Sequence, residues 1–332
     1  MTMKTIIKSE LRKMGLKIKS VKLLNKGGSS NEKFLVKTES EMYILKTFCI
    51  IKNKVMKIRD LQHQMDLMQK INEKEIVSIF PVHTKVLVFN CIYKIGYVYK
   101  FVKGEPLSKL LSSTPNQVDS FKIGKSIGKF HKYSKNLFKS KYKKITWKRR
   151  LFNITRQLKG SNFLKSHDCF SLLNNFISKT NPKSFTFLIR KYFSEYTNTR
   201  TQIIHTDLHE ENIIVTPTGN LILVDVDGLQ GGHTSQDIAG YLIPTHKLLD
   251  LSEIDDTIQY DKFLSGYKSE FKLTKNEVKI IPLWMLVRLL TNFEYIIDEI
   301  GKIPTSDTRK KIYKCSSILE HIRGIATQIL EN

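Results

Sequence analysis

Along the first hundred positions, some segments show the apolar spacing of a helix and others show the pattern of a β-strand. Residues 3–16 and 55–72 place apolar side chains at helical spacing between charged ones, which predicts two amphipathic helices. The segments around them are short, rich in β-branched and aromatic residues, and bounded by glycine or polar turns. They predict five strands, which we expect to pair antiparallel, at residues 21–24, 34–38, 42–48, 86–90 and 97–102.

The pattern changes after residue 102, where helical spacing replaces the two-residue period of strands. The predicted helices lie at residues 118–133, 143–196, 281–298 and 308–330. Strands first and helices later are typical of an α+β protein. We therefore predict two lobes, an antiparallel five-stranded lobe at residues 1–102 and a mainly helical lobe at residues 103–332.

Apolar content and cysteine spacing exclude several classes of protein. No apolar run approaches the roughly 18 residues that a membrane-spanning helix needs. The segment Met1–Lys19 carries charges throughout and lacks the apolar centre of a signal peptide. The four cysteines are scattered without a C-x-x-C pair, which argues against a zinc site or a disulfide framework. We expect a cytoplasmic protein without a membrane span.

The formal net charge of +24 is unevenly distributed along the chain. Residues 1–200 hold 42 basic and 12 acidic side chains, whereas residues 201–332 hold 13 basic and 19 acidic ones. Only ten of the basic residues are arginine, the side chain best suited to reading bases. A lysine-rich composition is also what an AT-rich genome would impose. We expect a solvated basic surface and no specific nucleic-acid partner, with only weak, salt-dependent binding to DNA.

The richest chemistry lies in two short turns flanked by apolar, strand-like runs. The first reads HTDLHEEN over residues 205–212 and contains Asp207 and Asn212, and the second reads VDVDG over residues 224–228 and contains Asp225. One carboxylate can accept the proton of an acceptor hydroxyl, while an amide and a second carboxylate can hold Mg²⁺ on the phosphates of ATP. Oxygen ligands suit the hard Mg²⁺ ion.

These motifs resemble the catalytic loop of the aminoglycoside phosphotransferase and choline kinase-like family, which has the pattern H-x-D-x-H-x-x-N followed by I-D-[FW]-[DE]. Asp237-Ile238-Ala239 is similar to the D-L-A segment of that family. The resemblance implies a two-lobed protein-kinase-like fold and an ATP- and Mg²⁺-dependent kinase with a hydroxyl acceptor. It makes Asp207 the catalytic carboxylate, and it makes Asn212 and Asp225 the metal ligands.

The same resemblance assigns a nucleotide-binding role to residues of the N-terminal lobe. A small-residue turn between the first two strands is similar to the G-G-x-x-N turn of the family, and it would bring backbone amides close to phosphate oxygens. Its residues are Gly27, Gly28, Ser29 and Ser30. Lys46 lies within an apolar strand and would grip the α- and β-phosphates, by resemblance to the family lysine. The backbone around Lys100 and Val102 resembles the hinge that binds adenine.

The acidic partner of this lysine cannot be assigned from the sequence. Kinase-like folds pair the lysine with an acid on the following helix. Here Gln64 occupies the aligned position, with Asp60 and Asp66 on either side. Either an aspartate substitutes or Gln64 contacts Lys46 as a neutral partner.

Several alternatives were weighed against a small-molecule kinase. His205 and His209 lie four residues apart, but a transition-metal site there has no obvious third ligand. The chain lacks the A-P-E and D-F-G motifs of protein kinases, which favours small acceptors such as aminoglycosides or other antibiotics, choline-type amino alcohols or sugars. A structural or low-activity homologue, similar to spore-coat members of the family, is the second hypothesis. A basic nucleic-acid-binding protein is the third.

The acidic C-terminal half suggests what kind of acceptor would bind. Five acidic residues cluster closely in sequence, at Asp250, Glu253, Asp255, Asp256 and Asp261. Because the local field governs what enters a cleft, this cluster favours an amine-bearing acceptor over an anionic one.

Overall fold

The computed structural model describes residues 2–26, 31–49, 58–73, 80, 83–89, 94–114, 119–137, 200–242, 260–282, 284, 285 and 288. The chain divides into two compact units, Met1–Lys109 with Ile213–Asp227 and Leu110–Asn212 with Gly228–Asn332. A short segment from the second half of the chain therefore belongs to the first unit. The lobe boundary after residue 102 stays a prediction, and the predicted helices at 143–196 and 308–330 lie outside the described residues.

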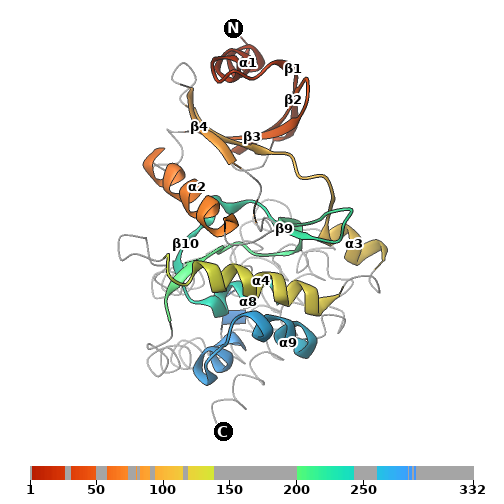
Figure 1. Cartoon of the computed structure of the whole chain (residues 1–332), viewed down its shortest axis with the longest axis vertical. Coiled ribbons are helices and arrows are strands. Elements are labelled where there is room, and N and C mark those ends of the chain that lie inside the picture. Colours follow the sequence, from red (N-terminus) through yellow and green to blue (C-terminus); the bar gives the residue numbers. More distant parts are fainter. Residues whose placement is uncertain are drawn as a thin grey trace, which may run out of the picture. The chain divides into compact units, whose positions relative to one another are not determined.

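The first unit contains a five-stranded antiparallel sheet with the strand order β1-β2-β3-β5-β4 (Figure 1). All five strands predicted from the sequence are present, with bounds within a few residues of those expected. They are β1 (Ile18–Lys26), β2 (Asn31–Thr38), β3 (Met42–Cys49), β4 (His83–Phe89) and β5 (Lys94–Lys100). The two predicted helices of this region are α1 (Met3–Lys13) and α2 (Ile58–Asn72).

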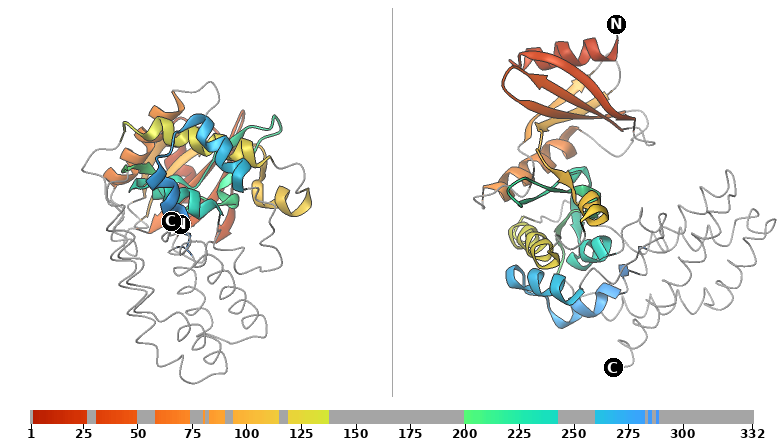
Figure 2. Two further views of the ribbon diagram at one scale, coloured as in Figure 1. Left: turned by 90° about the horizontal axis from the view of Figure 1, so that it is seen from below. Right: turned by 90° about the vertical axis from the view of Figure 1, so that its right-hand side faces the viewer.

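Helix α1 closes the core on one face of this sheet (Figure 2). The Thr2 side chain caps the helix by accepting a hydrogen bond from the Thr5 amide. Ile6, Ile7 and Leu11 then fall on one helical stripe and pack in a cluster with apolar side chains of the strands. Each fully buried side chain of this kind stabilises the fold by about 1.5–3 kcal/mol. The amphipathic pattern at the N-terminus therefore builds part of the core beneath the strands.

A second, smaller sheet of the first unit carries the later motif residues. Its strand order is β6-β8-β9, with β6 at Glu105–Pro106, β8 at Ile213–Val215 and β9 at Leu221–Leu223. In the β8–β9 hairpin Ile213 pairs with Leu223 and Val215 with Leu221. One 3₁₀ turn, η4 (Glu210–Asn212), precedes β8, and another, η5 (Val226–Gly228), follows β9. Helix α3 (Leu107–Ser113) follows β6 along the chain.

The second unit contains two helices that lie side by side, α4 (Ser120–Ser134) and α9 (Tyr260–Glu270) (Figures 1 and 2). Glycines allow this close approach, because a Cβ atom added at Gly124 or Gly266 would meet backbone oxygen of the other helix at 2.0 Å. The unit also contains a two-stranded antiparallel sheet and a further helix. These elements are β7 (Gln202–Ile204), β10 (Gln230–Gly232) and α8 (Thr234–Leu242).

A further helix in this unit begins at residue 275, six residues earlier than the apolar spacing predicted. Its start is a reciprocal capping box. The Thr274 hydroxyl accepts from the Glu277 amide at 3.2 Å, and the Glu277 carboxylate accepts from the Thr274 amide at 2.8 Å. The same carboxylate, which is buried, accepts two hydrogen bonds from Arg200 at 2.9 and 2.6 Å.

Replacing Glu277 by Gln should lower the free energy of unfolding by about 1–3 kcal/mol at pH 7. Burial alone would raise the pKa of Glu277, but the bonds from Arg200 and Thr274 outweigh it and lower that pKa below 4.5. A lowered pKa in the folded state contributes stability above the unfolded-state pKa, and this stability is lost as the pH falls. The difference between the variants should therefore shrink as the pH falls below about 5. Denaturant unfolding at several pH values measures this difference.

The matched control is Glu105→Gln, which removes the acid from an exposed pair with Lys109. An exposed pair should contribute less than about 1 kcal/mol. A loss of stability in Glu277→Gln that stayed constant between pH 3 and 7 would contradict the charge-based explanation.

Candidate active site

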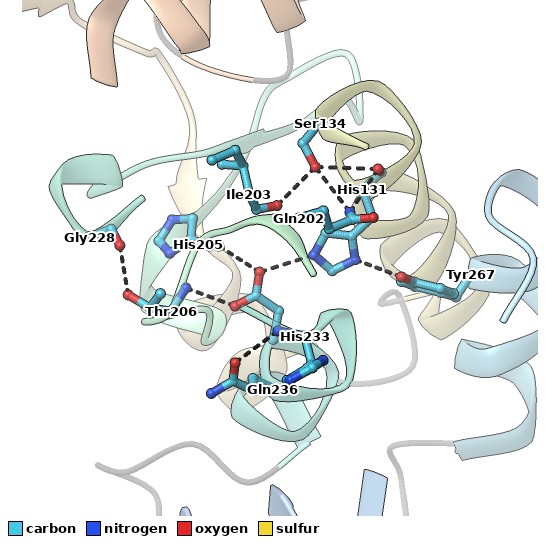
Figure 3. Close-up of polar contacts among 11 residues, drawn as sticks. His131, Ser134, Gln202, Ile203, His205, Thr206, Gly228, His233, Gln236 and Tyr267 are labelled. Carbon is cyan, nitrogen blue, oxygen red and sulfur yellow. Dashed lines mark hydrogen bonds and ion pairs between the residues drawn. The ribbon is translucent and has the colours of Figure 1, made fainter. Parts of the chain in front are cut away.

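The loop that carries Asp207 begins with strained backbone. Thr206 has φ +72°, a left-handed conformation that β-branched residues rarely adopt. Asp237 on α8 stabilises it, because its carboxylate accepts hydrogen bonds from the backbone amides of His205 (2.7 Å) and Thr206 (2.8 Å) (Figure 3). The Thr206 hydroxyl in turn donates to the Gly228 carbonyl at 3.0 Å. The loop is thus fixed immediately before the candidate catalytic residue.

Asp237 is itself supported by a chain of buried polar side chains, of which Figure 3 labels His131 and Tyr267. His131 on α4 contacts the Asp237 carboxylate through Nε2 at 3.1 Å and the Tyr267 hydroxyl through Nδ1 at 2.6 Å. Burial raises the pKa of Tyr267 well above its ordinary value, so its hydroxyl stays protonated and can donate to His131. His131 can then donate from Nε2 to Asp237. His131 is thus a packed histidine that supports Asp237.

Asp207 presents a carboxylate of which 56% of the side-chain surface is exposed. Arg288 donates to its Oδ1 at 3.1 Å, and His209 Nε2 lies 3.7 Å from its Oδ2. Burial would raise the pKa of Asp207, but the nearby His209 and the Arg288 guanidinium outweigh it and hold that pKa well below its usual range. The group is therefore an ionised, oriented carboxylate at neutral pH.

Asn212 follows Asp207 at the end of the 3₁₀ turn η4. Its Nδ2 donates to the Asp207 carbonyl at 2.8 Å and lies 2.9 Å from His209 Nε2. Among the described residues, both hydrogen-bonding contacts of the Asn212 side chain use its amide nitrogen, so the carbonyl oxygen Oδ1 is the atom that would bind a metal ion. Asn212 directly precedes β8 and Asp225 comes two residues after β9. Since Ile213 pairs with Leu223, the chain leaves the same end of the hairpin at both residues.

Asp225 belongs to the first unit and also adopts left-handed backbone, with φ +62°. Its Oδ1 contacts the ammonium group of Lys46, and its Oδ2 accepts from Lys33 at 3.2 Å. Lys46 is only 4% exposed, whereas Asp225 is 23% exposed. Strain in a non-glycine residue of this kind is frequent at functional sites. The interaction explains why a lysine lies within an apolar strand.

The oxygen donors of Asn212 and Asp225 are of the type that Mg²⁺ prefers, and the partial exposure of Asp225 allows a ligand to reach it. Among the described residues, no group of three or more His, Cys, Asp or Glu side chains could hold a metal ion by itself. Each of these two residue types suits a hard cation such as Mg²⁺, which takes further ligands from phosphate and water.

The structure describes only some of the remaining residues that were predicted to bind the nucleotide. Gly27, Gly28, Ser29 and Ser30 lie outside the described residues. Lys100 ends β5, and its exposed side chain donates to Glu41 at 2.6 Å. Val102 is half-buried in the segment that follows, after a backbone bond from the Phe101 amide to the Met42 carbonyl at 2.9 Å. Their roles stay predictions.

Two basic residues beside the candidate site were not singled out from the sequence. Lys33 is one of many lysines in a basic strand, and only the pairing with Lys46 across β2 and β3 distinguishes it. Arg288 was an isolated charge in the apolar run predicted as helix 281–298. The partner of Lys46 on α2 stays unassigned; Asp66 on this helix is exposed and accepts from Gln62 at 3.1 Å.

A two-lobed α+β fold of the protein-kinase type, with an aspartate–asparagine–aspartate set, defines a class of phosphoryl-transfer enzymes. The sequence profile of the phosphotransferase enzyme family matches residues 21–274, and the chain belongs to this family. It is an ATP-dependent phosphotransferase that acts on a hydroxyl group. ATP together with a divalent metal ion is typical of the family.

Solved structures of similar fold include three kinases with small acceptors in their names. A microcompartment-associated aminopropanol kinase has a TM-score of 0.63 at 14% identity, covering 98% of both chains. An amicoumacin kinase in complex with AMP-PNP, Ca²⁺ and Ami has a TM-score of 0.63 at 16% identity, covering 98% of this chain and 96% of the other. The choline kinase of Streptococcus pneumoniae has a TM-score of 0.58 at 16% identity, covering 97% and 99%.

No curated protein sequence matches this chain significantly. Among the helices that the structure describes, none is long and apolar enough to cross a membrane. Family and fold together indicate a kinase that acts on a small-molecule hydroxyl.

Proposed function

We propose that this protein transfers the γ-phosphoryl group of ATP to a hydroxyl of an amino alcohol, an aminoglycoside-type antibiotic or a sugar, in the cytoplasm. The observation that carries the proposal is Asp225. The family motif makes this residue a metal ligand, and it stands in left-handed backbone with its carboxylate against the buried Lys46. A carboxylate and an ammonium group so arranged are suited to a metal ion and to the phosphates that this ion binds.

On the acceptor side, Asp207 orients the hydroxyl that attacks. Its low pKa makes it a weak base before the reaction begins, so its main contribution is position. This suits a loose transition state, in which the hydroxyl proton is released late and alignment matters most. Arg288 and His209 keep the carboxylate in one orientation. The proton of the acceptor hydroxyl passes to Asp207 as the hydroxyl oxygen bonds to the γ-phosphorus, and the bond from that phosphorus to ADP breaks.

On the nucleotide side, Lys46 contacts the α- and β-phosphates, and the turn at Gly27, Gly28, Ser29 and Ser30 supplies backbone amides. The backbone around Lys100 and Val102 binds adenine. Asn212 and Asp225 hold Mg²⁺, which neutralises charge on the phosphates when bound. These roles come from the family motif, and the ion pair between Lys46 and Asp225 supports them.

The acceptor is proposed to carry an amine. The acidic cluster that suggests this falls mostly at residues 250–259, outside the described residues, whereas Asp261 is exposed on α9. Aminopropanol, amicoumacin and choline appear in the names of kinases with this fold, which supports the same class. A spore-coat-like structural role and a nucleic-acid-binding role remain the competing hypotheses.

Release of ADP from Mg·ATP, measured against a panel of hydroxyl compounds, tests the proposal. The panel should pair amino alcohols and amino sugars with neutral sugars and sugar acids of similar shape. Acceptor-dependent ADP release that stops on addition of a chelator is expected. Binding of Mg·ATP without turnover on any acceptor would favour the structural homologue, and a preference for sugar acids would overturn the amine assignment.

Lys46→Ala should raise the KM for ATP and lower kcat, with kcat/KM falling about 10–100-fold. Its contact with phosphate is a charge-assisted hydrogen bond of about 1.5–3 kcal/mol, present in both the ground and the transition state. Steady-state kinetics with varied ATP measure both constants. Lys22→Ala, an exposed lysine on β1, is the control. An unchanged ATP profile in Lys46→Ala would remove the phosphate role from this residue.

A further inference from the structure

A second lysine, Lys33, contacts the Asp225 carboxylate. Lys33 on β2 stands directly opposite Lys46 on β3 in the antiparallel register. Directly opposed residues project from the same face of a sheet, with Cβ atoms about 5 Å apart. The two ammonium groups converge on different oxygens of one carboxylate, Lys46 on Oδ1 and Lys33 on Oδ2. Like charges directly opposite each other are unfavourable unless an anion lies between them.

Two ammonium groups share this one carboxylate. The neighbouring acid on β2, Glu32, pairs with Lys94. Lys46 is 4% exposed, whereas Lys33 is 39% exposed. Lys33 therefore contributes its charge from the accessible side of the cluster.

We infer that Lys33 is a second phosphate-binding lysine, which contacts the terminal phosphates of ATP. This inference rests on the proposed function, in which Asp225 binds a metal ion. A carboxylate bound to a divalent cation no longer needs both ammonium groups. Phosphate oxygens can then accept hydrogen bonds from Lys33 in place of the Asp225 carboxylate. Lysine binds phosphate as a mobile point charge, so a small shift of the Lys33 side chain is sufficient.

The position of Lys33 predicts which phosphates it contacts. Lys46 is buried and is assigned to the α- and β-phosphates, whereas Lys33 lies on the accessible side of Asp225. Asp225 is the residue assigned to the metal ion, and in kinases the metal ion neutralises charge on the outer phosphates of ATP. Lys33 should therefore distinguish ATP from ADP and AMP. If Lys33 only screened the charge of Asp225, replacing it would change the affinities for Mg·ADP and Mg·ATP equally.

The test compares Lys33→Met with Lys37→Met, an exposed lysine on the same strand. Calorimetry should measure binding of AMP, Mg·ADP and Mg·ATP, with thermal unfolding as a check on the fold. In Lys33→Met we expect Mg·ATP to bind about 10-fold more weakly, Mg·ADP to be less affected and AMP to be unchanged. Lys33→Arg should restore most of the Mg·ATP affinity, and Lys37→Met should resemble the wild type.

Equal weakening of Mg·ADP and Mg·ATP, or no weakening of either, would overturn the inference. The proposed function would still stand in both cases, because the wild type would bind Mg·ATP. Absence of Mg·ATP binding by the wild-type protein would overturn both. The binding measurements require no acceptor, so they can be made before the acceptor is known.

Discussion

Replacing Asp207 by Asn should lower kcat at least 100-fold while leaving the affinity for Mg·ATP within about two-fold. Positioned proton acceptors typically contribute 10²–10⁴-fold to a rate, and asparagine keeps the shape of the side chain but cannot accept the proton as a carboxylate does. The nucleotide should be unaffected, because Asp207 is assigned to the acceptor. Single-turnover kinetics with a saturating acceptor and calorimetry with Mg·ATP measure the two quantities.

Asp66→Asn is the matched control, since Asp66 is an exposed acid on α2 with a local bond to Gln62. It should leave both quantities at wild-type values. Retention of more than about a tenth of turnover in Asp207→Asn would remove this residue from the catalytic role. Weakened Mg·ATP binding with normal turnover at saturation would instead place Asp207 on the nucleotide side.

Local sequence periods were sufficient to predict most of the first unit. Strand β3 shows why, because its β-branched and aromatic residues follow the polar Glu39-Ser40-Glu41 segment and its length is that of a single strand. Helix α1 is similar, since its apolar stripe and Thr2 cap are both local signals. These features depend on residues close in sequence. They could therefore be recognised without knowing the partners across the fold.

The start of the helix at residue 275 was missed although its signal is also local. The apolar spacing becomes regular only after Ile280, so a prediction based on spacing began the helix at 281. Thr274-x-x-Glu277 is a capping-box pattern and could have corrected the start. The contact between Glu277 and Arg200, 77 positions away, could not have been recognised in this way.

Charged contacts of the candidate site show more clearly what could not be predicted from the sequence. Lys33 and Asp225 are 192 positions apart, and Arg288 and Asp207 are 81 apart. Lysines are abundant in this chain, so the type of residue alone does not single out Lys33. Its pairing depends on the register of β2 against β3 and on where the β8–β9 hairpin ends. A shift of one residue in that register would turn Lys33 to the other face of the sheet.

Asp225→Ala should abolish the Mg²⁺-dependent part of nucleotide binding and lower kcat/KM for ATP at least 100-fold. A bound metal contributes several kcal/mol to stabilising charge on the transferred group, and about 1.4 kcal/mol corresponds to a factor of ten. The variant should also unfold more easily, by about 1–2 kcal/mol, because Lys46 loses the carboxylate that it contacts in a buried position. Calorimetry with and without Mg²⁺ and denaturant unfolding measure these effects.

A second prediction for Asp225→Ala distinguishes loss of the metal ion from a general loss of folded structure. Without the Asp225 carboxylate, Lys33 and Lys46 each lose one anionic partner, so metal-free ATP should bind at least as tightly as it does to the wild type. Asp225→Asn is the matched variant, because asparagine tolerates the left-handed backbone at φ +62°. It should show the same binding pattern with a smaller loss of stability. Unchanged Mg·ATP affinity in both variants would assign the metal to another acid, and Asp227→Asn is the first variant to make in that case.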